Sequence, residues 1–359
     1  MRSSLEDVNP SCYGTPMQDQ YQALFAAVDA YCAKLAALPP AALDSVVRST
    51  AVVSILLENI YQQQTADPIP ALLACIERQF PALADAQELA KHTVRPGSEE
   101  GGGTTTERLY EVAWGGYSDA TYDHAVSLVE DRLRRSGLDE AFFSGKRCFD
   151  GGCGIGRLSV AIARMGAAEV IAADIGQQSL DYAQRQARRL GLSTIRTARL
   201  DVTDLSRFPD GAFDFVASYG VLHHTPDCLT GVREHFRVTR RGGLFWLYLL
   251  GDGGLYWEVY DRLRAVIRTF PIEELKAALM RLRLREGFVY NYLDCMLAPR
   301  TYHLESDIIA LLKHADPGLS WQRAKGGSVI DDTDRVLAAR FGPQITGPQG
   351  EVRILVTRS

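Results

Sequence analysis

The sequence predicts an α/β protein, with a mostly parallel sheet covered by helices and an all-helical N-terminal domain before it. The first quarter of the chain has helical periodicity and no strand signal. After it, short apolar strands alternate with helices, and a glycine-rich turn at 150–157 joins the first strand to its helix. Sheets built in this way bind ligands at the carboxyl ends of their strands, so we look for the site there.

Residues 1–94 are interpreted as a helical cap domain. Six apolar residues recur at helical spacing until Pro39 and Pro40 stop the first helix. A second helix over 41–62 is apolar nearly all round and is expected to be buried, and shorter helices are expected over 68–79 and 82–92. The apolar residues of the first helix are Tyr21, Leu24, Phe25, Val28, Tyr31 and Leu35.

The segment 95–106, "RPGSEEGGGTTT", separates this domain from the rest of the chain. It has no apolar residue, so we expect a flexible linker or a mobile loop. Residues 107–359 then form the sheet domain, with a mostly helical insertion over 254–317. The strands are expected to begin near residues 147, 169, 194, 213, 243 and 351, with helices over 155–165, 177–191 and 229–239.

Composition narrows the functional classes. The chain is 46% hydrophobic and 23% charged with a formal charge of -5, which favours a small-molecule ligand over nucleic acid or a membrane surface. Seven cysteines form no CxxC pair and are odd in number, so we expect neither a zinc site nor a disulfide framework, and a cytoplasmic location. No signal-peptide core or long uncharged apolar run is visible, and a homodimer stays open.

The stretch "CFDGGCGIGRL" (148–158) runs from an apolar strand through glycines into a helix. Glycines there permit positive φ and let a ligand approach bare backbone, while the helix N-terminus presents free N–H groups. A dinucleotide site, a phosphate loop and a plain tight turn all fit this pattern, although the absence of a following Gly-Lys-Ser/Thr argues against a P-loop.

Three carboxylates narrow the choice. Asp174 ends the second strand, 18 residues after Gly156, where an acidic side chain can accept two ribose hydroxyls. Asp201 ends the third strand and can face an adenine amino group. Asp150 precedes the glycines and suits a ligand with an ammonium or sulfonium better than a pyrophosphate. This disfavours a nicotinamide enzyme.

In order and spacing, "DGGCGIG", the Asp of "AADI", "LDVTDL", "FDFVASYGVLHHTPD" and "VTRRGGLFWLYL" resemble the successive motifs of class I S-adenosylmethionine-dependent methyltransferases. The resemblance covers about 107–250 and implies a seven-stranded Rossmann-like sheet with S-adenosylmethionine as cofactor. It also implies that the glycine loop contacts the methionine part, that Asp174 holds the ribose and that Asp201 contacts adenine. The implied cofactor residues are Asp150, Gly151, Gly152, Gly154, Gly156, Asp174, Ile175, Asp201, Val202, Ser218, Tyr219 and Gly220.

A segment just upstream, "ERLYEVAWGGYSDATYDHA" (107–125), lies where such enzymes often fold a helix over the cofactor. Tyr110, Trp114 and Tyr117, with Tyr122, can present aromatic faces to a sulfonium. The alternative is that these rings only pack the domain junction.

Candidate catalytic residues are Tyr219, His223 and His303. Tyr219 should border the sulfonium, and neutral imidazole accepts a proton near pH 7. "LHHTPD" recurs in look-alikes with many chemistries, which favours a structural or gating role for His223 and its neighbour His224. His303 lies in "DCMLAPRTYHLESD", which can also be an ordinary loop with salt bridges.

The expected activity is methylation of a small molecule in specialised metabolism. The first alternative keeps the cofactor but uses its aminocarboxypropyl arm, by transfer or by closure to azetidine-2-carboxylate, and releases methylthioadenosine. A Rossmann dehydrogenase or a silent binding module is the second alternative. Since an activated methyl mainly needs alignment and exclusion of water, no Ser/His/Asp or metal cluster is required.

Overall fold

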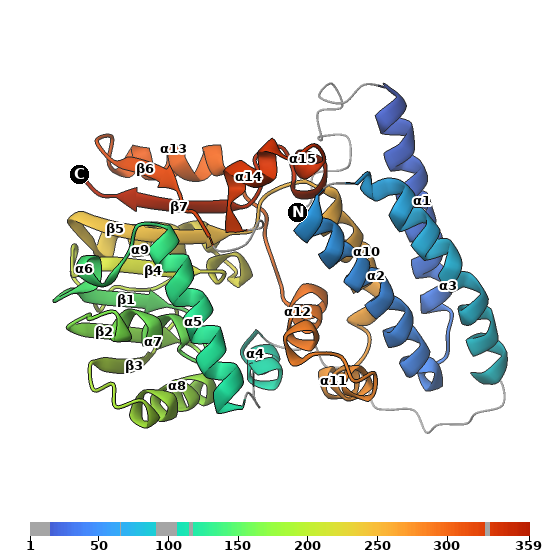
Figure 1. The fold of residues 1–359 in the computed structure, drawn as a ribbon, viewed down its shortest axis with the longest axis horizontal. Helices are drawn as coiled ribbons and strands as arrows, with labels where there is room; N and C mark the ends of the chain where they lie inside the picture. Colours follow the sequence, from blue (N-terminus) through green and yellow to red (C-terminus); the bar gives the residue numbers. More distant parts are fainter. Residues whose placement is uncertain (1–14, 65, 91–105, 115–117, 327–330) are drawn as a thin grey trace. The chain divides into compact units, whose positions relative to one another are not determined.

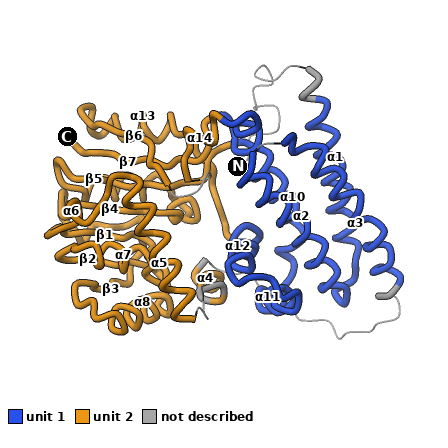
Figure 2. The backbone as a smooth tube through the Cα atoms, viewed as in Figure 1, with its two compact units in different colours: residues 1–104, 253–297, 339–348 blue, residues 105–252, 298–338, 349–359 orange. Residues whose placement is uncertain are grey.

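The computed structural model describes residues 15–64, 66–90, 106–114, 118–326 and 331–359 (Figure 1). These residues form two compact units (Figure 2). The helical unit is made of the described parts of 1–104, 253–297 and 339–348, and the sheet unit is made of those of 105–252, 298–338 and 349–359.

The helical unit is assembled from three separate stretches of the chain. Of the six residues in the predicted apolar stripe of its first helix, Leu24, Val28, Tyr31 and Leu35 are buried, and the other two are half-buried. A buried hydrogen bond accompanies this packing, between the Tyr31 hydroxyl and Ser49 Oγ, which are 2.6 Å apart. The α-helices of the unit are α1 (Thr15–Ala36), α2 (Leu43–Gln63), α3 (Pro68–Ala90), α10 (Leu255–Ile267), α11 (Ile272–Arg281), α12 (Glu286–Leu297) and α15 (Gly342–Thr346).

Helix α3 corrects the expectation of two helices over 68–79 and 82–92. It is continuous, with Pro81 inside it. Proline lacks an N–H and so removes one helical hydrogen bond, but its fixed φ is compatible with the helix, and here the turns on both sides continue.

Within the described part of the chain, one helix is long and apolar enough to cross a membrane by length and composition, although no such helix was expected from the sequence. It covers Pro40–Gln63, with a mean hydropathy of 1.4 over its most apolar window. Because 56% of that window is buried inside the structure, the same properties describe a core helix of a helical domain.

The sheet unit contains a seven-stranded sheet in the order β3-β2-β1-β4-β5-β7-β6. Strands β1 to β5 are parallel, whereas β7 runs antiparallel to both β5 and β6. This confirms the predicted mostly parallel, Rossmann-like architecture. The strands are β1 (Arg147–Gly151), β2 (Glu169–Asp174), β3 (Ile195–Arg199), β4 (Phe213–Tyr219), β5 (Thr239–Leu249), β6 (Ser320–Arg323) and β7 (Val352–Thr357).

Two strands differ from the expected positions. β5 begins at Thr239 rather than near 243, because the "TRRGG" segment extends the strand beside β4. β6 was not located from the sequence, since it has only four residues and most of them are exposed, which leaves no apolar alternation to detect.

Helices cover both faces of the sheet (Figure 1). One hydrophobic cluster joins α5, α7 and their neighbours to one face, and a second joins α9 and α13 to the other. The remaining helices, α4 and α14, are short. The helices of this unit are α4 (Thr106–Trp114), α5 (Asp119–Arg135), α6 (Glu140–Phe143), α7 (Arg157–Arg164), α8 (Gln177–Arg189), α9 (Cys228–Val238), α13 (Glu305–Ala315) and α14 (Thr333–Ala338).

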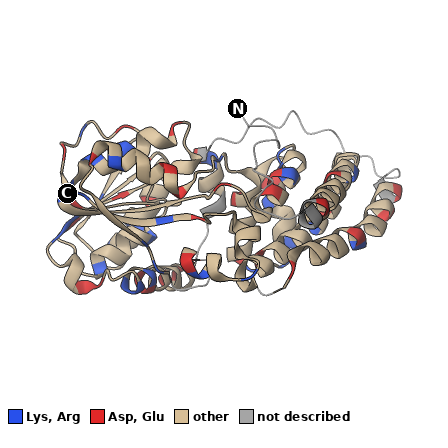
Figure 3. Ribbon diagram, turned by 90° about the horizontal axis from the view of Figure 1, so that it is seen from above, with Lys and Arg blue, Asp and Glu red and all other residues tan. Residues whose placement is uncertain are grey.

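The predicted insertion 254–317 is divided between the units. Its first three helices, α10 to α12, group with the N-terminal helices. Helix α13 belongs to the sheet unit, because Ile308, Ile309 and Leu312 are buried in the cluster on one face of the sheet. Acidic and basic residues are interspersed along both units (Figure 3), in keeping with the modest net charge of -5.

Candidate functional site

The glycine loop follows the carboxyl end of β1 and precedes α7. Gly152, Gly154 and Gly156 all have positive φ, at 80°, 52° and 82°. The N–H groups of Gly152 and Cys153 each donate to the carbonyl oxygen of Ala173 on β2 at 2.8 Å. The loop is thereby fixed to the neighbouring strand, and its backbone conformation is one that glycine adopts at little cost.

These glycines serve different purposes, which the sequence could not distinguish. A Cβ on Gly152 would lie 2.2 Å from Val221 Cγ1, and one on Gly156 would lie 2.7 Å from Ala183 Cβ. A Cβ on Gly151 would lie 2.0 Å from His235 Nε2. A Cβ on Gly154 would meet no atom within 4 Å. Gly154 is therefore the member of this set that borders open space, while the other three permit close packing.

Asp150 lies at the end of β1 under the loop. Its side chain is almost fully buried, and Ser159 Oγ on α7 donates to Asp150 Oδ2 at 2.6 Å. Burial raises the pKa of Asp150 to about 7, and the Ser159 hydrogen bond offsets part of this shift. A positive charge nearby would therefore stabilise the ionised form of this carboxylate.

Asp174 ends β2, and the adjacent backbone orients its carboxylate. Gly154 N–H donates to Oδ2 at 2.8 Å and Gly176 N–H donates to Oδ1 at 2.9 Å. A carboxylate has about four acceptor positions, so one on each oxygen remains available for further donors. Burial raises the pKa of Asp174, partly offset by these N–H groups. The next side chain, Ile175, is 48% exposed, which places an apolar surface beside the carboxylate.

Asp201 and Val202 follow β3. Thr203 donates both its N–H and its hydroxyl to Asp201 Oδ1, each at 2.8 Å. These bonds fix an exposed carboxylate in one orientation, while Val202 is buried in the core cluster beneath it.

Ser218, Tyr219 and Gly220 occupy the end of β4. Ser218 Oγ is fully buried and has no hydrogen-bond partner within the described part of the chain. Arg353 on β7 donates to the Tyr219 hydroxyl at 2.6 Å, and the Arg132 guanidinium lies 5.1 Å from the Tyr219 ring. Gly220 has φ of 76° and donates its N–H to Tyr248 O.

Both of these arginines also contact Asp331, at 2.8 Å for Arg132 and 3.4 Å for Arg353. Tyr219 is thus part of an ionic network, which sequence reasoning missed because its members come from α5, β7 and the segment before α14. No signal in the sequence joins such distant segments.

Two predicted histidines lie beyond β4. His223 is almost completely buried, and its Nδ1 has no partner among the described residues. Burial, reinforced by nearby His224, lowers the pKa of His223 well below its usual value, so the ring is neutral at pH 7. The adjacent His224 places Nδ1 2.6 Å from Pro299 O.

The structure also brings His303 to this neighbourhood. Thr301 N–H donates to His223 O at 2.8 Å, and Thr301 Oγ1 lies 2.9 Å from His303 Nε2. Partial burial lowers the pKa of His303. Thr301 therefore bridges the two candidate catalytic histidines, which are 80 residues apart in the chain.

The aromatic residues upstream of the sheet, which were predicted to lie over the cofactor, occupy different environments. Tyr110 on α4 lies edge-on to His224, with ring centroids 5.7 Å apart. Trp114 ends α4, but its side chain is not described, and Tyr117 lies outside the described residues. Tyr122 is fully buried and donates its hydroxyl to Ile155 O at 3.1 Å, so it supports the glycine loop from below.

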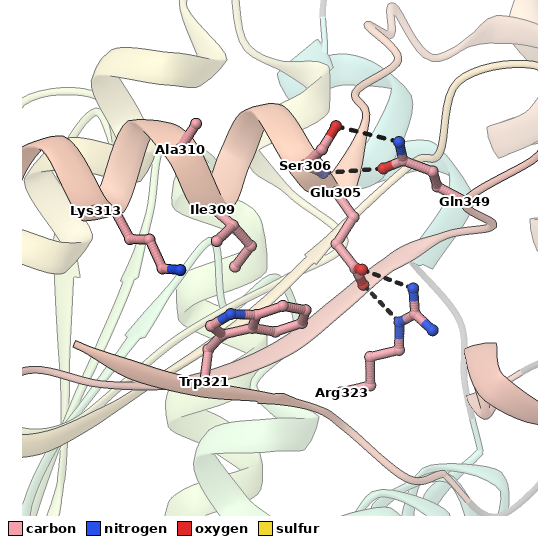
Figure 4. Close-up of a pocket in the computed structure, with 8 residues that line it drawn as sticks. All are labelled: Glu305, Ser306, Ile309, Ala310, Lys313, Trp321, Arg323 and Gln349. Atoms are coloured by element: carbon pink, nitrogen blue, oxygen red, sulfur yellow. Dashed lines mark hydrogen bonds and ion pairs between the residues drawn. The ribbon is translucent and has the colours of Figure 1, made fainter. Parts of the chain in front are cut away.

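An open pocket of about 490 Å³ lies elsewhere in the sheet unit, between α13 and β6 (Figure 4). Lys313 and Ile309 point from α13 toward the ring of Trp321. At its other end the Arg323 guanidinium donates to both oxygens of Glu305, at 2.7 and 2.8 Å. None of its lining residues is a predicted cofactor residue.

The residues at the carboxyl ends of β1 to β4 fit S-adenosylmethionine. Gly154 borders open space beside the oriented carboxylate of Asp174, and Ile175 offers an exposed apolar surface next to it. Asp150 supplies a buried carboxylate that a ligand cation would stabilise. Among the described residues, no group of three or more His, Cys, Asp and Glu side chains is arranged to hold a metal ion.

Comparison with known proteins agrees with this geometry. Residues 149–247 match the family model "Methyltransferase domain". The chain is 34% identical over 113 residues to a ubiquinone biosynthesis O-methyltransferase of Neisseria meningitidis, covering 31% of this chain and 48% of that protein. It is 30% identical over 136 residues to a demethylmenaquinone methyltransferase of Geobacillus kaustophilus, covering 35% of this chain and 56% of that protein.

The chain thus spans about half the length of these curated relatives. Among solved structures, it is similar to an S-adenosylmethionine-dependent methyltransferase from Mesorhizobium loti, with 26% identity and a TM-score of 0.30 over 34% of this chain and 53% of that one. The matched residues 149–247 run from β1 into β5 and include the glycine loop, Asp174 and Asp201. The chain therefore carries a class I S-adenosylmethionine-dependent methyltransferase domain, with S-adenosylmethionine as its cofactor.

Proposed function

We propose that this protein transfers the methyl group of S-adenosylmethionine to a small molecule of specialised metabolism. The observation that carries the proposal is the open space at Gly154 beside the Asp174 carboxylate, which two backbone N–H groups hold in place. A carboxylate fixed in this way can accept both ribose hydroxyls, as expected for this family.

The cofactor supplies an activated methyl on a sulfonium, so the protein contributes binding, alignment and exclusion of water. Asp174 would accept hydrogen bonds from the ribose, Ile175 would pack against adenine, and Asp201 would accept from the adenine amino group. Asp150 stabilises the positively charged end through its buried carboxylate. Tyr110, Trp114 and Tyr117 are proposed to cover the cofactor.

His223 is the proposed proton acceptor. Its ring is neutral at pH 7 and Nδ1 has no partner among the described residues, so this nitrogen is available for a proton. Burial lowers the pKa of the ring and makes it a weak base, so we propose that it takes the proton only after methyl transfer has made the acceptor hydroxyl or amine acidic. His303 is proposed to act through Thr301, which holds the two segments together. Tyr219 is proposed to border the reacting methyl, with its hydroxyl oriented by Arg353.

The relatives support a small-molecule acceptor. Those named above are a ubiquinone biosynthesis O-methyltransferase and a demethylmenaquinone methyltransferase, and a third is a sterol 24-C-methyltransferase of Aspergillus fumigatus, 30% identical over 149 residues. We further propose a cytoplasmic enzyme that binds neither nucleic acid nor membranes and assembles as a homodimer. Light scattering of the purified protein tests the assembly.

Incubation of the pure protein with S-adenosylmethionine, with and without a panel of phenolic, amine and carboxylate acceptors, tests the reaction. The proposal predicts S-adenosylhomocysteine only when an acceptor is present. Release of methylthioadenosine without an acceptor would reject it in favour of chemistry on the aminocarboxypropyl arm. Calorimetry distinguishes both S-adenosylmethionine reactions from that of a dehydrogenase, because a dehydrogenase would bind a nicotinamide dinucleotide and not S-adenosylhomocysteine.

A further inference from the structure

The helical unit contains a polar cluster around Glu58 on helix α2. Three donors from two other helices converge on one oxygen of this carboxylate, Oε1. They are the hydroxyl of Tyr256, the hydroxyl of Tyr260 at 3.4 Å and Nδ2 of Asn291 at 2.8 Å. Burial raises the pKa of Tyr256 well above its usual value, so its hydroxyl remains protonated and continues to donate.

The second oxygen of Glu58, Oε2, accepts no hydrogen bond from the residues that the structure describes. Glu58 is half-buried rather than enclosed. A carboxylate oxygen offers two acceptor positions, so Oε2 retains the capacity for at least one strong bond. The cluster therefore fixes the direction of the carboxylate through one oxygen and leaves the other available.

Aromatic rings surround this carboxylate. Tyr61 and Tyr256 stack with centroids 4.5 Å apart, and Trp257 and Tyr260 lie 4.7 and 5.0 Å from Tyr256. All four rings are buried. They lower the local polarity, so a charge interaction with Glu58 is worth more here than in water.

No Lys, Arg or His of the described chain pairs with Glu58, although the protein has ion pairs elsewhere, such as Arg262 with Glu258 at 2.7 Å. Burial raises the pKa of Glu58, and its three donors offset only part of this shift. A partly buried carboxylate without a cation is costly, and a cation brought by a ligand would remove that cost.

We propose that Glu58 Oε2 is the counter-ion for the protonated amine of a small, partly apolar ligand that binds in the helical unit, against the Tyr61, Tyr256 and Trp257 cluster. A carboxylate favours an ammonium group over a neutral or anionic one, and the surrounding rings strengthen this preference by lowering the local polarity. Glu58 cannot serve a neutral hydroxyl equally well, because the gain from pairing two opposite charges would be lost.

The competing explanation is that Glu58 is a purely structural acid, protonated and satisfied by its neighbours. It predicts no selectivity for amines. The two explanations also differ in the Glu58→Gln variant, because glutamine preserves the shape and hydrogen-bonding capacity of a protonated acid but cannot pair with an ammonium.

The test uses the full-length protein and three probes of matched shape: 2-phenylethylamine as the cation, 2-phenylethanol as the neutral analogue and 3-phenylpropionate as the anion. Ligand-observed NMR titration at pH 7.5 measures their affinities. We expect the amine to bind at least tenfold more tightly than either analogue. Equal affinities, or no measurable binding of the amine, would overturn the proposal without any variant being needed.

Two variants localise the effect. Glu58→Gln should lower amine affinity at least tenfold, while the matched control Glu77→Gln, an exposed carboxylate on α3 of the same unit, should leave it unchanged. Equal amine binding by wild type and a folded Glu58→Gln protein would assign the selectivity to another site and reject the proposal. S-adenosylhomocysteine affinity, measured on the same samples, reports separately on the sheet unit, so failure of the proposed methyl transfer is distinguishable.

Discussion

Asp174 in the sheet unit and Glu58 in the helical unit are both partly buried carboxylates whose direction is fixed by hydrogen bonds, but the donors differ. Asp174 is held by the backbone N–H groups of Gly154, in the loop after β1, and of Gly176, two residues further along the chain. Glu58 is held by side chains of α10 and α12, about 200 residues further along the chain.

The difference decides what a sequence reveals. A site built from backbone needs glycines at fixed positions and a carboxylate at the end of a strand, and this leaves a compact motif. A site built from side chains on separate helices needs only a Glu, a Tyr and an Asn at positions that tertiary packing brings together. The first is visible in one stretch of letters, whereas the second appears only in three dimensions.

The largest expected effect tests whether backbone geometry really governs the sheet-unit site. Gly152→Ala should lower the free energy of unfolding by about 3 kcal/mol, because it combines the cost of positive φ with a Cβ that would lie 2.2 Å from Val221. Gly154→Ala is the matched control with φ of 52° and open space, so it should cost only about 1 kcal/mol of stability.

Gly154→Ala should instead weaken S-adenosylhomocysteine binding, because its methyl group enters the space reserved for the cofactor. Urea denaturation and calorimetry measure the two quantities. If both variants lost the same stability, the distinction between a packing glycine and a ligand-facing glycine would be wrong.

A second prediction concerns the cost of burying charge in the same loop. Asp150 has a folded-state pKa raised to about 7, so the native state holds a proton that the unfolded chain releases near pH 4. The stability that this bound proton contributes to the native state is fully present below about pH 4, and it is lost as the pH rises through about 7.

Asp150→Asn mimics the protonated form at every pH. It should therefore stabilise the cofactor-free protein by a few kcal/mol at pH 8 and by little at pH 4, while weakening S-adenosylmethionine binding. Denaturation curves at the two pH values decide the matter, and a gain independent of pH would exclude burial of the Asp150 charge as its cause.

Next in size is the loss of the ribose contact. Asp174→Ala should weaken S-adenosylhomocysteine binding by at least ~1.5 kcal/mol, or more than tenfold, since charged hydrogen bonds are lost. Asp181→Ala on the neighbouring helix α8 removes an exposed carboxylate and should leave the affinity unchanged. An unaltered affinity in a folded Asp174→Ala protein would place the ribose elsewhere.

The sequence correctly predicted the elements that depend on residue patterns within a short stretch of the chain. The six strands with apolar patterning were located, and the apolar stripe of α1 is buried at four of its six predicted positions, while Tyr21 and Phe25 are half-buried. The glycine loop was placed between β1 and α7, because strand, glycines and helix are contiguous.

Features that depend on distant partners could not be found in this way. β6 is short and exposed, and Pro81 signalled a break where surrounding turns keep the helix intact. The Arg132–Asp331–Arg353 network and the Glu58 cluster combine segments that only folding brings together. The sequence also placed all four loop glycines against the ligand, whereas three of them meet neighbouring side chains and Gly154 borders open space.

The smallest effect is expected at Ile175, where the sheet unit uses a side chain rather than backbone to meet the cofactor. Since this residue is 48% exposed, Ile175→Ser should change the free energy of unfolding by no more than about 0.5 kcal/mol. Removing an apolar surface that adenine would cover should weaken S-adenosylhomocysteine binding by about 1 kcal/mol, roughly fivefold. Calorimetry resolves such a change, and Leu128→Ser, at an exposed leucine on α5, controls for the general effect of removing surface apolar area. An equal loss in both variants would mean that Ile175 does not contact adenine and that the backbone-built contacts alone orient the cofactor.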